Sequence, residues 1–273
     1  MDQAGKLTYA TYLKVRELTG LQHTLSHPPQ HDELFFIIVH QVYELWFKQM
    51  LHEIEAIYER LGGGLVAQTC EAFNRIHAIQ RILIQQIHLL ETMFAVDFAR
   101  FRANLNPASG FQSVQFRIVE FLSGEKEDMY FDMVDGEPEE MAALRAARAR
   151  PTIYDALLSF LKRAGFDIPD EVLSRDFGRR YKGHEGVRRE LLRLYNSADS
   201  QYLLFRLCEH YMEYDELAAL WRAHHVEMVR RMIGGKVGTG GSSGASYLEK
   251  RITIRYFPEL WELRDGIQDA PAY

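Results

Sequence analysis

The feature that most constrains the fold is a set of three long segments in which apolar residues recur every three or four positions. They cover residues 33–61, 68–105 and 200–233. This spacing places the apolar side chains along one face of an α-helix. At 1.5 Å per residue, the first helix alone would be about 43 Å long. Helices of that length bury their apolar faces side by side, so we expect an all-α, bundle-like single domain over residues 1–273 with long core helices.

Helix-breaking residues indicate where these segments end. Three consecutive glycines, 62–64, follow the first, and the second should end before Asn106-Pro107 because the residue preceding a proline avoids the helical region. Asp199 is positioned to cap the third, which ends at glycines 234–235. The only β-like run, 253–256, is too short to predict a sheet. Further helices are expected at 111–122, at 142–150, from Pro151 onward and at 185–195.

Composition and charge exclude several classes of protein. With 32 Lys and Arg against 38 Asp and Glu, the net charge of −6 argues against a nucleic-acid or anionic-membrane partner. The two cysteines, Cys70 and Cys208, form no Cys-x-x-Cys pair, which excludes a disulfide scaffold and favours the reducing cytoplasm. The longest purely apolar run, 34–39, is far shorter than the roughly 18 residues of a membrane span, and no secretion signal is expected.

Two histidines lie on apolar helical stripes. His40 shares a stripe with Phe36 and Phe47, and from this spacing alone a satisfied core histidine is favoured over a pocket residue. His225 follows Trp221 by four residues in a seam of aromatic residues and methionines. A single imidazole facing an apolar cavity suits the axial ligand of a haem, and ordinary packing is the alternative. The motifs His-Glu-x-x-His and Glu-x-x-His are absent, which argues against a zincin and a di-iron bundle.

One arginine and one glycine-rich loop complete the candidates. Arg102 follows Phe98 by four residues, and a guanidinium beside an apolar seam needs a partner. Either a buried salt bridge or a bidentate contact with a substrate carboxylate would supply it. The loop 234–244 has six glycines in eleven positions. It is either a flexible linker or a lid whose backbone amides and hydroxyls, on Thr239, Ser242 and Ser243, contact a ligand.

Four blocks of the sequence together resemble the tryptophan 2,3-dioxygenase family, haem enzymes that open the indole ring of L-tryptophan. They are YATYL at 9–13, FIIVHQVYELWFKQ at 36–49, ETMFAVDFARFRANLNPASGFQSVQFR at 91–117 and HHVEMVRRMIGGKVGTGGSSG at 224–244. The resemblance implies haem b, ferrous when active, with O₂ as co-substrate. It also implies insertion of both oxygen atoms across the indole C2–C3 bond. The product would be N-formylkynurenine, in the first step of the kynurenine route.

The resemblance also implies roles for single residues. His225 would be the axial ligand of the haem iron, and His40 would accept a hydrogen bond from the indole N–H on the opposite side. Phe36 would pack on the indole ring. Arg102 would bind the substrate carboxylate, and Thr239 would hold its ammonium group together with a haem propionate. His40 is the one residue expected to act in catalysis, as a base or only as an orienting acceptor, and we favour orientation because the indole N–H is a very weak acid.

Other implied roles concern the edge of the site and the assembly. Phe98 lies where some relatives have tyrosine, so here no phenolic hydroxyl helps to bind the carboxylate, and Ser109 would line the haem edge. The N-terminal arm, 1–30, would contact a neighbouring subunit of a homotetramer, with Tyr9 and Tyr12 reaching its site. The segment 128–182 would be a variable region, and 234–244 the lid.

Without the resemblance, other functions compete. A haem-based gas sensor or carrier also needs one axial histidine and an apolar pocket, but it needs neither Arg102 nor a glycine-rich lid. A helical scaffold would bind no cofactor. A related dioxygenase would act on another indole derivative, without the carboxylate that Arg102 is expected to bind.

Overall fold

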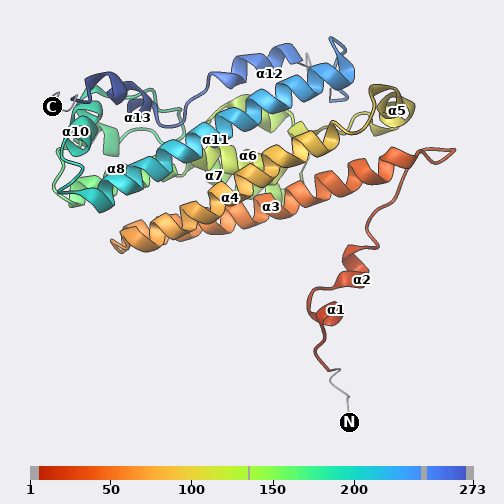
Figure 1. The fold of residues 1–273 in the computed structure, drawn as a ribbon, viewed down its shortest axis with the longest axis horizontal. Coiled ribbons are helices and arrows are strands. Elements are labelled where there is room, and N and C mark those ends of the chain that lie inside the picture. Colours follow the sequence, from red (N-terminus) through yellow and green to blue (C-terminus); the bar gives the residue numbers. More distant parts are fainter. Residues whose placement is uncertain (1–5, 135, 241–244, 269–273) are drawn as a thin grey trace, which may run out of the picture.

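The computed structural model describes residues 6–134, 136–240 and 245–268, with 245–247 described by their backbone alone. Every regular element in these ranges is a helix, so the all-α prediction is confirmed. Three long helices form the body: α3 (His31–Gly62), α4 (Val66–Leu90) and α11 (Tyr202–Ile233). They lie side by side, with α3 antiparallel to α4 and α11 parallel to it (Figure 1). Gly64, at φ 74°, adopts the left-handed conformation that the tight turn between α3 and α4 requires.

The prediction of one continuous helix over 68–105 is wrong. Helix α4 ends at Leu90, and α5 (Ala95–Phe101) continues at 89° to it. Phe94 is extended at the break, with φ −79° and ψ 145°, although the segment contains neither glycine nor proline. The bend puts Phe101 into a small buried cluster with Met93 and Met232 of α11. Tertiary packing therefore overrides helical periodicity here.

The bend also bears on membrane insertion. Taken singly, no described helix has the length and apolar character that a bilayer crossing requires. Helix α4 and the following helical segment 95–105 meet that threshold only as a sharply bent pair.

Shorter helices close the bundle, and several predicted boundaries need correction. The helix predicted at 142–150 begins at Pro138, and the one predicted at 111–122 divides into a 3₁₀ turn and a helix that starts at Val114. Asp199 does not cap α11, because Gln201 is the residue before its first turn. Pro151 does not begin a helix either: Thr152 caps α8, accepting a hydrogen bond from the amide of Asp155 at 3.2 Å. The predicted helix 185–195 is found without change. The remaining helices are α1 (Tyr9–Tyr12), α2 (Val15–Leu18), α6 (Val114–Ser123), α7 (Pro138–Ala149), α8 (Ile153–Arg163), α9 (Asp170–Leu173), α10 (Glu185–Tyr195), α12 (Ala245–Ile252) and α13 (Pro258–Glu262), with 3₁₀ turns η1 (Arg102–Leu105), η2 (Gly110–Gln112), η3 (Asp128–Asp132) and η4 (Leu263–Gly266).

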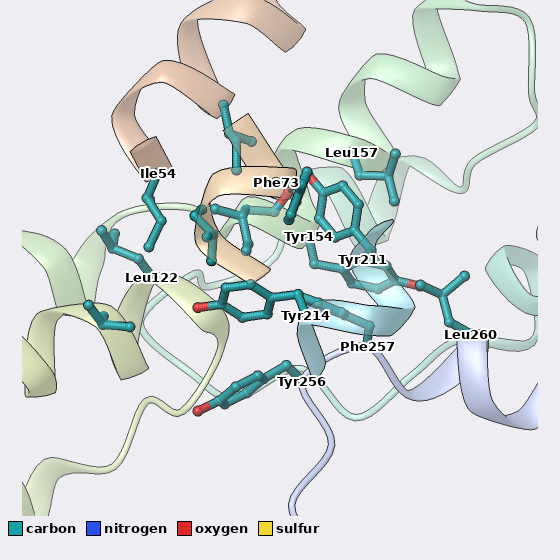
Figure 2. Packing of buried hydrophobic residues seen from close by; sticks show 14 of the residues in the cluster. Ile54, Phe73, Leu122, Tyr154, Leu157, Tyr211, Tyr214, Tyr256, Phe257 and Leu260 are labelled. Atoms are coloured by element: carbon teal, nitrogen blue, oxygen red, sulfur yellow. Dashed lines mark hydrogen bonds between the residues drawn. The ribbon is translucent and has the colours of Figure 1, made fainter. Parts of the chain in front are cut away.

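A cluster of large aromatic side chains forms the core where α4, α8, α11 and α13 meet. Figure 2 shows Phe73, Tyr154, Tyr211, Tyr214 and Phe257 packed together, all of them almost fully buried, with Tyr211 in contact with Phe73, Tyr154 and Phe257. The hydroxyl of Tyr211 donates to the carbonyl oxygen of Ile153 at 2.8 Å. The aromatic bodies are thus removed from water while this polar tip keeps a partner, which avoids an unsatisfied buried group.

The β-like run 253–256 is not a strand but an irregular connection that crosses α11. The carboxylate of Asp215 accepts hydrogen bonds from the amides of Tyr256 (2.8 Å) and Phe257 (3.1 Å). Arg222 donates to the carbonyl oxygen of Ile254 at 2.8 Å. These bonds hold the chain between α12 and α13 against α11, so α12 lies along the end of α11 (Figure 1).

The N-terminal arm leaves the body of the molecule. Helices α1 and α2 extend away from the long helices (Figure 1). Tyr9 and Tyr12 are 78% and 72% exposed, and Leu7 is 74% exposed. The arm therefore presents apolar side chains that nothing in the described part of this chain covers.

Candidate functional site

An apolar cavity of about 710 Å³ lies at the end of the bundle where α3, α5, α6 and α11 meet. This volume falls within the range of small-molecule and cofactor sites, roughly 300–1,000 Å³. Two of the candidate residues, Tyr9 and Tyr12, lie on the exposed arm and do not line it. The other candidates all do: Phe36, His40, Phe98, Arg102, Ser109, His225 and Thr239. Residues nearly two hundred positions apart thus share one cleft.

His225 enters the cavity from α11. Its ring stacks on Trp221 one helical turn earlier, with centroids 5.0 Å apart and planes at 17°. Within the described residues, neither ring nitrogen of His225 makes a hydrogen bond. Burial, and secondarily the positive charges that His40 and Arg117 would bring nearby, lower the pKa of His225 to about 4. The imidazole is therefore neutral at pH 7 and has a lone pair free for a metal ion.

His40 enters the same cavity from α3, and one of its nitrogens is already engaged. Its Nδ1 lies 2.7 Å from the carbonyl oxygen of Phe36, one turn back. Because a carbonyl only accepts, Nδ1 carries the hydrogen and Nε2 is left as an acceptor. Burial lowers the pKa of His40, more than its hydrogen bond to Phe36 raises it. At neutral pH the residue presents a fixed, uncharged acceptor.

A wall of aromatic rings stands beside His40. The Phe36 ring lies 4.1 Å from the His40 ring and stacks with Phe98 at 5.6 Å, at an interplanar angle of 27°. Phe101, fully buried, meets both phenylalanines edge-on at 5.7 Å and 5.4 Å. These contacts fix the orientation of the wall, which is suited to a flat apolar ring.

The cavity also has a polar rim, next to the aromatic wall. Arg102, half-buried on η1, donates a hydrogen bond to the carbonyl oxygen of Val237. In the described ranges the guanidinium has no ion pair, so the salt-bridge alternative finds no partner there. The hydroxyl of Thr239 donates to the carbonyl oxygen of Ala108 at 2.7 Å, which leaves its oxygen lone pairs as acceptors. A cation and a hydroxyl therefore face the cavity from neighbouring segments.

These bonds dock the start of the glycine-rich loop on the turn at 107–109. A Cβ at Gly240 would lie 2.6 Å from Cβ of Ser109, so only glycine allows the two backbones to approach this closely. Residues 241–244, with Ser242 and Ser243, lie outside the described residues. For 236–240, the contacts favour a lid over a free linker.

Several charged residues of the cavity were not singled out from the sequence. Arg117 and Glu120 of α6 form a buried ion pair, and Arg222 and Arg251 also line the cavity. The spacing of Arg117 and Glu120, three apart in an otherwise apolar helix, is a signal that could have identified them. A buried pair of this kind needs good geometry and further partners to persist.

The cavity matches the requirements of a haem. A haem needs a large apolar pocket, a neutral imidazole with a free lone pair, and charged or polar groups for its propionates. His225 provides the imidazole, and the cavity walls are predominantly apolar. Arg117, Arg251 and Ser109 lie on its border. The donor set therefore fits one haem with a single protein ligand.

Comparison with known proteins adds independent information. A family model described as tryptophan 2,3-dioxygenase matches residues 1–144 and 178–267. A tryptophan 2,3-dioxygenase of a Nocardioides species is 46% identical over 271 residues, 97% of each chain. The enzyme of Herpetosiphon aurantiacus is 40% identical over 264 residues, which cover 97% of this chain and 99% of the relative. That of Anaeromyxobacter dehalogenans is 41% identical over 264 residues, which cover 97% of each chain. The unmatched stretch, 145–177, lies inside the segment 128–182 that we expect to be variable.

We expect Gly240→Ala to undock the glycine-rich loop. The new methyl group would clash with Ser109, and relief of the clash would break the bonds from Thr239 to Ala108 and from Arg102 to Val237. Trypsin cleavage after Lys236 should then be about tenfold faster. Gly235→Ala is the matched control, because nothing lies within 4 Å of its Cβ position. Equal cleavage of the two variants would contradict the docking.

Proposed function

This chain belongs to the tryptophan 2,3-dioxygenase family, and from that membership we propose that it inserts both atoms of O₂ across the indole C2–C3 bond of L-tryptophan. The product is N-formylkynurenine, and the reaction is the first step of tryptophan degradation by the kynurenine route. The observation that carries the proposal is the single cavity shared by His225, His40 and Arg102, because the reaction needs an iron ligand, an indole acceptor and a carboxylate partner together.

We propose that haem b occupies the cavity with His225 as its axial ligand. When bound, haem supplies the activation of O₂, whose triplet ground state otherwise reacts slowly with a closed-shell indole. The protein contributes the neutral imidazole of His225, which stacking on Trp221 orients. Arg117, Arg251 and Ser109 line the cavity, and we propose that the propionates lie beside them.

On the opposite side of the cavity, His40 and Phe36 position the indole. His40 Nε2 accepts the hydrogen bond of the indole N–H, and the hydrogen bond to Phe36 fixes the tautomer that makes this acceptance feasible. Phe36 and Phe98 pack on the ring. The N–H bond and the ring plane together set the direction in which C2–C3 points, and such positioning lowers the entropic part of the barrier.

Arg102 and Thr239 bind the amino-acid end of the substrate. Arg102 binds the carboxylate with the guanidinium hydrogens that its bond to Val237 leaves free. Thr239 accepts a hydrogen bond from the ammonium group. Fixing the ring, the carboxylate and the ammonium group selects the L-enantiomer. The loop 234–244 closes over the site and excludes water, since its first part already docks beside Ser109.

Self-association as a homotetramer fits the exposed surface. The arm, 1–30, carries exposed Tyr9 and Tyr12, which we propose reach the cavity of a neighbouring subunit. On α3, Leu34, Ile38 and Leu45 are 45%, 43% and 50% exposed and lie on one helical face. A stripe of this kind is typical of a helix that packs against another subunit. Two free cysteines are compatible with the cytoplasm.

The central test is spectroscopic and chemical. Purified protein should show a Soret band, and ferrous protein should convert L-tryptophan in air with a rise in absorbance from N-formylkynurenine. His225→Ala should lose the Soret band and the activity while keeping its helical circular dichroism, because only the iron ligand is removed. A protein that binds haem but leaves L-tryptophan unchanged would instead be a gas sensor or carrier.

Arg102→Ala should lower kcat/KM for L-tryptophan by at least about tenfold, because a charge-assisted hydrogen bond is worth about 1.5–3 kcal/mol. Turnover of tryptamine, which has no carboxylate, should change little in the same variant. Arg100→Ala, on the exposed side of α5, is the matched control. If Arg102→Ala reduced both substrates equally, Arg102 would not be the carboxylate partner.

His40→Ala should lower kcat/KM by about tenfold without abolishing turnover, because a lost acceptor leaves the indole N–H unpaired. The pH profile provides the second readout. Burial lowers the pKa of His40 below its usual 6.5, so the wild-type kcat/KM should stay level as the pH falls to that value and decrease only below it. This decrease should be absent in His40→Ala. Complete loss of turnover, with haem and L-tryptophan still bound, would instead make His40 a base.

A further inference from the structure

A second cluster of metal-ligating side chains lies away from the cavity, between the middle of α4 and the first half of α11. His77 comes from α4, and His210 and Glu213, three residues apart, come from α11. Each of the three side chains offers one ligand atom, and these three atoms lie within 4.8 Å of one another. None of the three lines the cavity, and no other group of this kind occurs among the described residues. The cluster therefore has no part in the function proposed above.

Hydrogen bonding leaves the lone pair of His77 facing a carboxylate. His77 Nε2 lies 3.0 Å from the carbonyl oxygen of His210, which can only accept, so Nε2 carries the hydrogen. The other nitrogen, Nδ1, lies 3.2 Å from Oε2 of Glu213. If the imidazole is neutral, the lone pair of Nδ1 and the carboxylate oxygen Oε2 are two acceptors that face each other at 3.2 Å. Either a proton on Nδ1 or a cation between the two atoms would remove the repulsion.

The surroundings of His77 oppose the proton. Burial lowers the pKa of His77 below its usual 6.5, more than the charge of Glu213 and the hydrogen bond to His210 raise it. The ring is then neutral at pH 7, which is the form that binds metal ions.

His210 adds a third metal-ligating side chain, and one of its ring nitrogens has no hydrogen-bond partner among the described residues. The residue is 6% exposed, and the nitrogen in question is Nδ1, which is buried. Burial lowers its pKa as well, with Arg206 as the next contribution, so this ring is also neutral at pH 7. A buried unsatisfied nitrogen costs free energy, and a bound cation would satisfy it.

We propose that His77, His210 and Glu213 bind one divalent transition-metal ion of the Zn²⁺ class, with water at the fourth position. Two ligand atoms of a tetrahedral zinc site, each about 2.0–2.1 Å from the metal, are about 3.3 Å apart. The separation of 3.2 Å between His77 Nδ1 and Glu213 Oε2 matches this value. Imidazole nitrogen with one carboxylate oxygen suits zinc, nickel and copper better than calcium or magnesium.

Charged neighbours set the strength of the site. Arg81 donates to Oε1 of Glu213, which orients the carboxylate and leaves Oε2 for the metal. Arg81 and Arg206 repel a cation, whereas Glu209 and Glu213 attract it. A bound metal would bridge α4 to α11, whose far ends line the cavity through Leu90 and His225. Its role would be to stabilise this helix pair.

The test is zinc binding by the haem-containing protein. After removal of adventitious metal with a chelating resin, wild-type protein should bind one zinc ion per chain, with a Kd of about 10 µM or tighter by calorimetry. Glu213→Gln and His77→Gln should each weaken binding at least about tenfold. Glu216→Gln, exposed on the same helix, is the matched control and should bind zinc like the wild type.

Folding is checked in the same experiment. Glu213 is 36% exposed, so Glu213→Gln should keep the Soret band and the thermal midpoint measured without zinc, even if the variant of buried His77 is unstable. Zinc should raise the midpoint of wild type and Glu216→Gln but not that of Glu213→Gln. No zinc binding by wild type at 10 µM would overturn the proposal. Equal binding by all variants would also overturn it, because surface histidines would then be the ligands.

Discussion

The packing of α4 between the antiparallel α3 and the parallel α11 is the interaction on which the rest of the structure depends. Toward one end of the helix array, large aromatic side chains such as Tyr211, Tyr214 and Phe257 fill the space with α8 and α13 (Figure 2). At the other end α4 stops at Leu90, while α3 and α11 continue as the walls of the cavity. The well-packed core thus holds two long helices rigidly enough for their ends to enclose an open site.

Burial makes both cavity histidines neutral, and their different hydrogen bonding gives them different capacities. Both rings have lowered pKa values because they are surrounded by protein, so neither is charged at pH 7. His40 has one nitrogen bound to the backbone of its own helix, which fixes it as an acceptor. His225 has no hydrogen bond in the described part of the chain and is held by stacking on Trp221. One is suited to orient a substrate, the other to bind a metal.

The packing of α4 on α11 brings together the residues of the zinc-class site that we propose. His77 and His210 are far apart in the sequence, but the packing of α4 on α11 puts Nε2 of one 3.0 Å from the carbonyl oxygen of the other. Here too burial produces neutral rings. The difference is that Glu213, half-exposed, supplies a negative ligand that the cavity histidines lack.

Local periodicity was enough to predict the all-α class, the span 185–195 and most of α3 and α11, because helix formation depends on neighbours three and four residues apart. The stripes containing His40 and His225 followed from the same spacing, and the resemblance added their expected roles. The bend after Leu90 could not be predicted, since no breaker marks it and burial of Phe101 against Met232 decides it. Nor could the pairing of Arg102 with Val237, or the meeting of His77 with Glu213. Those contacts join residues more than a hundred positions apart, and only the tertiary packing of whole helices determines which of them form.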